Sequence, residues 1–197
     1  MSRAAKSKKD ETHDRILAVA ARAIRRDGYA GTGVAAVMKE AGLTHGGFYA
    51  HFGSRDAMLV EALGRAGEES RGHVARAREA AHTRGISPFR ALVETYLADE
   101  HLDRLDIGCP IAALGCDMPR QSKAVRKASA AGVQQLIAGV RSALPHSSQA
   151  ITATIGGTLV GSLQMARTLG NNAEGRAHLA SVRKTLLAQF DQPYPRH

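Results

Sequence analysis

The chain has 197 residues, which is the length of one large domain or two small ones. Hydrophobic residues make up 44%, which excludes global disorder, and the absence of Trp with only four Phe disfavours a protein that binds single strands by base stacking. The formal net charge is +9, and residues 1–55 carry ten Lys and Arg against five acidic residues. We therefore expect an anionic partner that binds near the N-terminus.

The sequence predicts a cytoplasmic protein without a membrane partner. Cys109 and Cys116 are too few for a disulfide framework, and the first ten residues are polar and basic rather than signal-like. The longest apolar stretch, 151–169, is interrupted by Gln164 and Arg167. Acidic residues between 99 and 106, with His101, are interpreted as a solvated helix face, so we expect no metal site and no cofactor.

The hydrophobic periodicity predicts an all-α fold. Residues 1–11 read as a basic, disordered arm that carries Arg3, Lys6, Lys8 and Lys9, and this arm either contacts the phosphates of the anionic partner or only improves solubility. Apolar residues then recur every three or four positions from Thr12, and Gly28 is placed to end this first helix.

Helix start and stop signals continue through the rest of the chain. Pro88 and Pro110 are each placed at the first turn of a helix, and the second of these helices is expected to end near Met118 and Pro119. A long helix is predicted to start at Ser54, which caps it. Three more long helices are predicted over residues 122–144, 147–169 and 173–190. No strand or hairpin pattern is found in the sequence.

Residues 34–52 have the pattern of a helix-turn-helix. Gly42 permits the sharp turn between two short helices, Leu43 fills the angle between them, and Thr44 is a favourable N-cap for the second. That second helix would then project into a DNA major groove about 12 Å wide.

The run from Gly42 to Phe52 resembles the recognition-helix signature of the tetracycline-repressor (TetR) family. The flanking Gly28-Tyr29, Gly31-Thr32 and 54–59 segments resemble the corresponding parts of the same family, over about residues 12–63. The resemblance implies a three-helix DNA-binding domain at 12–60 and a larger helical effector-binding and dimerisation domain at 61–197.

The resemblance also implies a role for each residue of this segment. Phosphate contacts are expected from Thr32, Tyr49, His51 and Arg55, with Lys39 assisting at the backbone, and base-edge contacts from Thr44, His45, Gly46 and Gly47. Because two of these positions are glycines, His45 is expected to carry much of the direct readout. Phe48 and Phe52 are interpreted as core residues.

Family resemblance further implies a homodimer that binds a palindromic operator on double-stranded DNA. The last two helices would form the dimer interface. Gly157 and Gly161, four residues apart, favour close helix approach, either to a partner or within the chain.

The sequence leaves two classes of effector: a small molecule that binds in a pocket, and an electrophile or oxidant that reacts with a thiol. Cys109 lies at a predicted helix N-terminus, where the dipole favours a thiolate, and Cys116 follows on the same helical face about 10.5 Å away, too far for a disulfide. The alternative, that both cysteines are structural, is the commoner situation, since small buried residues are frequent in helical cores. An apolar pocket is predicted from Phe89, Tyr96, Leu97, Met118, Met165 and Leu169.

The sequence therefore predicts a transcriptional regulator, most simply a repressor that its effector releases from DNA. An architectural DNA-binding protein would leave about two-thirds of the chain unexplained. An enzyme is disfavoured because no nucleophile elbow, phosphate loop or zinc-binding helix motif is present.

Overall fold

A computed structural model describes residues 7–191, and within this range helices are the only regular secondary structure. The all-α prediction is confirmed. The α-helices are α1 (Lys8–Gly31), α2 (Val34–Glu40), α3 (Arg55–His82), α4 (Pro88–Tyr96), α5 (Glu100–Asp103), α6 (Pro110–Leu114), α7 (Lys123–Ala143), α8 (Gln149–Leu169) and α9 (Ala173–Phe190). Two 3₁₀ segments, η1 (His45–Ala50) and η2 (Met118–Arg120), complete the structure.

Helix α1 begins at Lys8, four residues before the expected start. Ser7 forms a capping box with Asp10, because the Ser7 hydroxyl accepts a hydrogen bond from the Asp10 amide and the Asp10 carboxylate accepts one from the Ser7 amide. Lys8 and Lys9 therefore belong to the helix, which corrects the arm prediction for those residues. Arg3 and Lys6 of the expected arm lie outside the described residues.

The regular part of α1 ends at Gly28, as predicted. Gly28 adopts φ 71°, a left-handed conformation that favours glycine, and the chain makes one further helical turn up to Gly31. This turn places Tyr29 in the interior, where it is buried.

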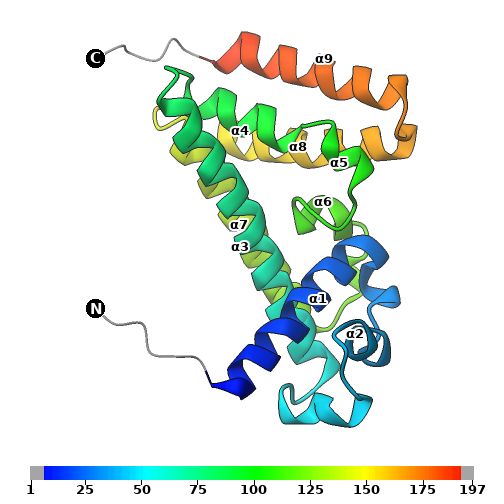
Figure 1. Ribbon diagram of the computed structural model, residues 1–197. Helices are drawn as coiled ribbons and strands as arrows, with labels where there is room; N and C mark the ends of the chain where they lie inside the picture. Colours follow the sequence, from blue (N-terminus) through cyan, green and yellow to red (C-terminus); the bar gives the residue numbers. More distant parts are fainter. Residues whose placement is uncertain (1–6, 192–197) are drawn as a thin grey trace, which may run out of the picture.

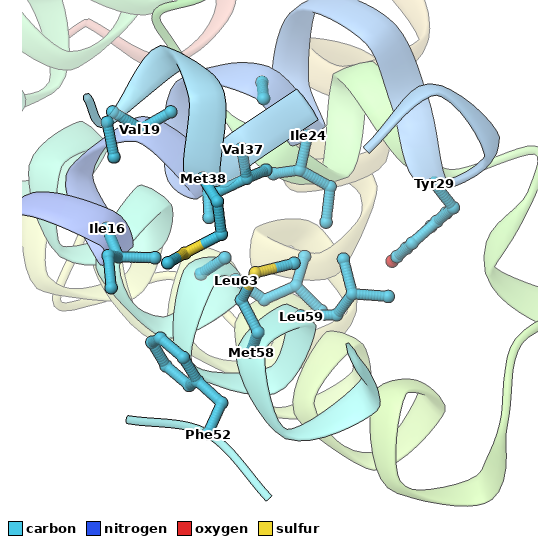
Figure 2. Packing of buried hydrophobic residues seen from close by; sticks show 14 of the residues in the cluster. Ile16, Val19, Ile24, Tyr29, Val37, Met38, Phe52, Met58, Leu59 and Leu63 are labelled. Carbon is cyan, nitrogen blue, oxygen red and sulfur yellow. The ribbon is translucent and has the colours of Figure 1, made fainter. Parts of the chain in front are cut away.

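Helices α1 and α2, segment η1 and the first turns of α3 share one hydrophobic cluster. Figure 2 shows side chains from α1, α2 and α3, together with Phe52 from the loop after η1, converging on a common interior. Its largest fully buried members are Ile16, Ile24, Met38, Phe48, Met58 and Leu59. This cluster holds the three-helix unit at the N-terminal end of the molecule.

The two halves of the molecule are joined by a continuous helix. The 28-residue α3 passes through the expected domain boundary at 60/61 and runs from the N-terminal unit toward α4 (Figure 1). Leu114 of α6 and Val125 of α7 are also buried in the N-terminal cluster. The N-terminal unit is therefore packed against the second half and not tethered by a loop.

The second half is a layered helical bundle with its own core. Pro88 and Pro110 occupy first-turn positions of α4 and α6, as predicted, but α6 ends at Leu114, earlier than expected. The core includes Phe89, Leu92, Leu97, Ile155, Leu159 and Leu163. Helices α8 and α9 lie side by side at the end of the molecule opposite α2 (Figure 1). No helix of the described range is long and apolar enough to cross a membrane.

Candidate nucleic-acid interface and ligand cavities

The turn between α2 and η1 has the geometry expected of a helix-turn-helix. Gly42 adopts φ 69°, the left-handed conformation that a sharp turn requires. The Leu43 amide donates to the Met38 carbonyl across 2.9 Å, and the Leu43 side chain packs against the N-terminal core. Both roles predicted for these residues are confirmed.

The second element of the motif is a short 3₁₀ segment, and its cap differs from the prediction. Thr44 occupies the N-cap position, but its side chain makes no capping hydrogen bond. The Thr44 backbone carbonyl instead accepts from the Gly47 amide across 3.1 Å. The Thr44 hydroxyl is exposed and remains available for an outside partner.

Segment η1 separates an exposed face from a buried one. Phe48 is fully buried and stacks near Phe52, with ring centroids 5.5 Å apart, which confirms both as core residues. His45 and Gly46 are exposed, and 70% of Tyr49 is accessible. Phe48 thus anchors η1 in the core, while His45 and Tyr49 form a polar and aromatic outer surface.

The two glycines of η1 differ in the space around them. A Cβ atom added at Gly46 would meet nothing within 4 Å, whereas at Gly47 it would lie 3.7 Å from the Met38 Cε atom, an ordinary contact. Neither position requires glycine for packing within this chain. The backbone at Gly46 is bare on its outer side.

Thr32 has a structural role and does not lie at the surface. Its side chain is fully buried, and its hydroxyl donates to the Gly28 carbonyl across 2.7 Å. A buried hydroxyl cannot reach a phosphate, so the predicted contact from this side chain is wrong.

Arg55 also makes internal contacts. Its Nε atom donates to the Thr32 carbonyl across 3.1 Å, and Nη2 donates to the Tyr29 carbonyl. These bonds satisfy backbone carbonyls at the end of α1, which lack helical partners. The half-buried Arg55 side chain thus fastens the start of α3 to the end of α1.

Lys39 precedes η1 in the chain, and His51 follows it directly. Lys39 is exposed in the last turn of α2. His51 is half-buried, and its pKa lies below the ordinary value because of burial and, less strongly, the neighbouring His13 and Lys9. An imidazole that resists protonation is a hydrogen-bond donor rather than a cation at neutral pH.

Sequence reasoning did not single out His13. Its ring stacks on Phe52 with centroids 4.5 Å apart, and Nε2 lies 2.8 Å from Glu61 Oε2. It therefore holds the region after η1 against α1 and α3. No local motif indicates this role, because the partners lie 39 and 48 residues away along the chain.

Residues 16–62, which contain this motif, match the sequence model of the bacterial regulatory proteins of the tetR family. This segment of the chain therefore has the sequence of a TetR-family DNA-binding domain. The HTH-type transcriptional regulator LmrA of Bacillus subtilis (strain 168) is 29% identical over 122 residues, which are 60% of this chain and 63% of LmrA. The matched region thus spans less than two-thirds of that relative's length.

Solved structures of TetR-family regulators share the fold over nearly the whole chain. A regulator from Agrobacterium tumefaciens superposes with a TM-score of 0.76 at 17% identity, over 93% of this chain and 99% of its own. One from Chloroflexus aurantiacus J-10-FL gives 0.71 at 21% identity, over 92% and 96%. At these identities the likeness concerns the fold alone.

The second half contains an apolar cavity of about 390 Å³ between α3, α4, α6 and α7. Of the residues predicted to form a pocket, Tyr96 and Met118 line it, and so does Cys109. Phe89 does not line it and packs in the core beside it. Met165 is 59% exposed on the outside of α8, so its predicted pocket role is wrong.

The two cysteines occupy different environments. Cys109 is a buried free thiol at the N-cap position of α6, and it lines the cavity. Cys116 is an exposed free thiol beyond the end of α6 at Leu114. The expectation that both lie on one helical face is therefore wrong, because the helix is only five residues long.

Tyr96 is the most strongly perturbed group at the cavity wall. Burial, and then the adjacent Cys109, raise the pKa of the Tyr96 hydroxyl well above its ordinary value. Arg167 of α8 lies near both residues, and its Nε donates to the His101 carbonyl across 3.1 Å. Residues 7–191 contain no group of three or more His, Cys, Asp or Glu able to hold a metal ion.

One face of helix α8 is left largely uncovered by the described part of the chain. An added Cβ at Gly157 or Gly161 would meet no atom within 4 Å outside its own helix, which excludes the intramolecular packing considered for these glycines. Exposed or half-exposed residues recur on the same face, namely Ile151, Thr154, Gly157, Thr158, Gly161, Met165 and Thr168. Leu159 and Leu163 on the opposite face are buried.

Proposed function

We propose that this protein is a homodimeric transcriptional repressor that binds a palindromic operator in double-stranded DNA. The observation that carries the proposal is the outer face of η1, where exposed His45, Gly46 and Tyr49 surround the buried anchor Phe48. A rigidly anchored short segment with polar and aromatic groups outside suits insertion into a major groove.

The contacts divide by chemistry. His45 and the exposed Thr44 hydroxyl face base edges, and the bare backbone at Gly46 and Gly47 lets the segment approach the groove closely. Lys39, Tyr49 and His51 contact phosphates from either side. The excess of basic residues in positions 1–55 supports the same surface by long-range attraction.

The exposed face of α8 is the proposed dimer interface. Its glycines allow close approach of a second helix, and the Ile151 and Met165 side chains, which are 38% and 59% exposed, would be buried there. A twofold axis at this end would hold two η1 segments at a fixed separation, as two half-sites require.

Release from DNA follows occupation of the apolar cavity by a small molecule or modification of the Cys109 thiol on its wall. Either event acts on α6 and α7, which line the cavity. The same helices supply Leu114 and Val125 to the N-terminal core. A shift of α6 or α7 therefore changes the tilt of the DNA-binding unit.

Selection of bound sequences from random duplexes by the purified protein tests the DNA-binding part. We expect a palindrome whose half-site centres lie about one helical turn, 34–36 Å, or a multiple of it, apart. Binding without any enriched sequence would contradict an operator and favour an architectural protein.

Thiol control is tested on the selected duplex with the Cys116→Ser protein before and after alkylation. Release that is absent in the Cys109→Ser, Cys116→Ser double variant supports control at Cys109. Unchanged binding after complete alkylation of Cys109 rules out thiol control and leaves a small molecule as the effector.

A further inference from the structure

A second, polar cavity of about 280 Å³ adjoins the apolar one. Side chains from α1, α3, α4 and α5 and from the loop before α6 line it. The two cavities share four lining residues, Ser70, Val74, Tyr96 and Cys109. Because they share these residues, the two cavities lie side by side.

Three side chains of the second cavity carry a buried polar atom that has no hydrogen-bond partner. These atoms are Arg25 Nε, Tyr96 Oη and His101 Nδ1, and their residues are 5%, 5% and 4% exposed. They make up half of the six such atoms found in the described part of the chain. Unpartnered buried polar atoms are rare and costly, so their concentration around one cavity indicates a missing partner.

The partner that these atoms require is rich in hydrogen-bond acceptors. The Arg25 Nε–H group can only donate, and Arg25 Nη2 is already occupied by Glu69 at 2.7 Å. Burial raises the pKa of Tyr96, so its hydroxyl keeps the proton that it donates. Burial lowers the pKa of His101, so this ring contributes no charge at neutral pH.

The charge of the lining favours a singly charged group over a dianion. Three arginines line the second cavity, Arg25, Arg76 and Arg104, against two glutamates, Glu69 and Glu100. The excess is one positive charge. A carboxylate balances this excess, whereas a dianionic phosphate would leave an uncompensated negative charge near Glu69 and Glu100.

We propose that the second cavity holds the carboxylate of an amphipathic carboxylic acid whose apolar body occupies the larger cavity. The larger cavity suits such a body, because Leu63, Leu92, Ile111, Met118 and Leu136 line it. This inference rests on the proposed function, in which the cavity receives the effector, and it names the effector's chemical class.

Calorimetric titration of the purified dimer with decanoate and with decanamide tests the proposal. The amide matches the acid in shape and lacks its charge. We expect decanoate to bind at least about tenfold more tightly, since charge-assisted hydrogen bonds are lost in the amide. 4-Phenylbutyrate and its amide repeat the comparison with an aromatic body.

Two variants locate the carboxylate. Arg76→Gln, an exposed site that lines only the second cavity, is expected to weaken decanoate binding about tenfold and to leave decanamide unchanged. Tyr96→Phe is expected to weaken both ligands, and decanoate more, because its hydroxyl donates to a carboxylate and to an amide carbonyl. Arg78→Gln is the matched control, because Arg78 lies two residues away on α3 and lines only the larger cavity. It should leave the preference for the acid intact.

Several results would overturn the proposal. These are equal binding of acid and amide, loss of the preference in Arg78→Gln instead of Arg76→Gln, or no binding of either acid at millimolar concentration. Operator release is measured separately on the same samples. Decanoate that binds as expected and leaves the operator bound contradicts release by occupation of the cavity, while the carboxylate site stands.

Discussion

The hydroxyl oxygens of Tyr29 and Ser129 lie 3.2 Å apart in the interior, although 100 residues separate them in the chain. Tyr29 follows the break in α1, and Ser129 lies on α7 at the wall of the apolar cavity. This hydrogen bond therefore links the DNA-binding unit directly to a helix that a cavity ligand would contact.

Removing this link should destabilise the protein. We expect Tyr29→Phe to lower the free energy of unfolding by about 1 kcal/mol, because one buried hydrogen bond is lost and the ring is kept. Urea unfolding of Tyr29→Phe, Ser129→Ala and the double variant gives their coupling. Additive effects of the two substitutions would show that the bond contributes nothing of its own.

Arg55→Ala should act on stability before it acts on DNA. The backbone carbonyls of Tyr29 and Thr32 lose their donor, and we expect a loss of about 1–3 kcal/mol. Thermal or urea unfolding without DNA measures it, with Lys39→Ala as a surface control. An unchanged midpoint for Arg55→Ala would return this residue to the set of plain phosphate contacts.

His45→Ala and Lys39→Ala should separate base readout from phosphate binding. We expect His45→Ala to reduce discrimination between the selected operator and random duplex, by about 1–3 kcal/mol. Lys39→Ala should weaken both about equally and reduce the salt dependence by roughly one charge. Binding titrations at several salt concentrations measure both. Identical effects of the two substitutions would contradict the proposed division.

Gly161→Arg should break the dimer without unfolding the chain. The position is open, and arginine favours a helix over glycine by several tenths of a kcal/mol, so the monomer should not lose stability. Sedimentation equilibrium measures the mass, and Ala130→Arg, at an exposed site of α7, is the control. A Gly161→Arg protein that remains dimeric would move the interface away from this face of α8.

Stability should fall as the solution becomes acidic, through His101. Burial lowers the pKa of His101 in the folded protein below its ordinary value of 6.5, so the unfolded chain binds the proton more readily. Above pH 6.5 the His101 ring is neutral in both states and does not lower the free energy of unfolding. That free energy falls as the pH drops from 6.5 toward the pKa of His101 in the folded protein. His51 shifts in the same direction for the same main reason.

Urea unfolding at a series of pH values from 7.5 to 5 measures this effect. We expect the slope against pH to flatten in His101→Asn, which keeps a polar side chain without an ionisable ring. The carboxylates with lowered pKa values, Asp27 and Glu69, act below their ordinary values of 3.8 and 4.5 and do not interfere in this range. An equal slope in His101→Asn would assign the effect to other groups.

Local chemistry explains what could be predicted from the sequence. First-turn prolines at Pro88 and Pro110, the left-handed glycines Gly28 and Gly42, and the serine cap Ser54 each act within a few residues of themselves. Amphipathic spacing likewise located α7, α8 and α9 to within about two residues at each end. The core positions of Phe48 and Phe52 were predicted from the resemblance to the TetR signature, and both residues are buried.

The predictions that the structure corrected concern contacts over long distances in the chain. Thr32 looks like a surface donor in isolation, but the packed domain buries it completely. Met165 has the apolar character of a pocket residue, yet it lies on the outer face of α8. No property of either segment alone distinguishes these cases.

The sequence by itself determined the helical elements, the turn of the DNA-binding motif and its anchoring residues, because hydrogen bonds and sterics within one or two turns govern them. Only the tertiary structure decided which polar groups are buried, that Leu114 and Val125 belong to the N-terminal core, and that two cavities share Tyr96 and Cys109. Burial and cavities depend on how whole helices pack, and each helix has several faces that could be turned inward. Packing of all the helices together selects one of them.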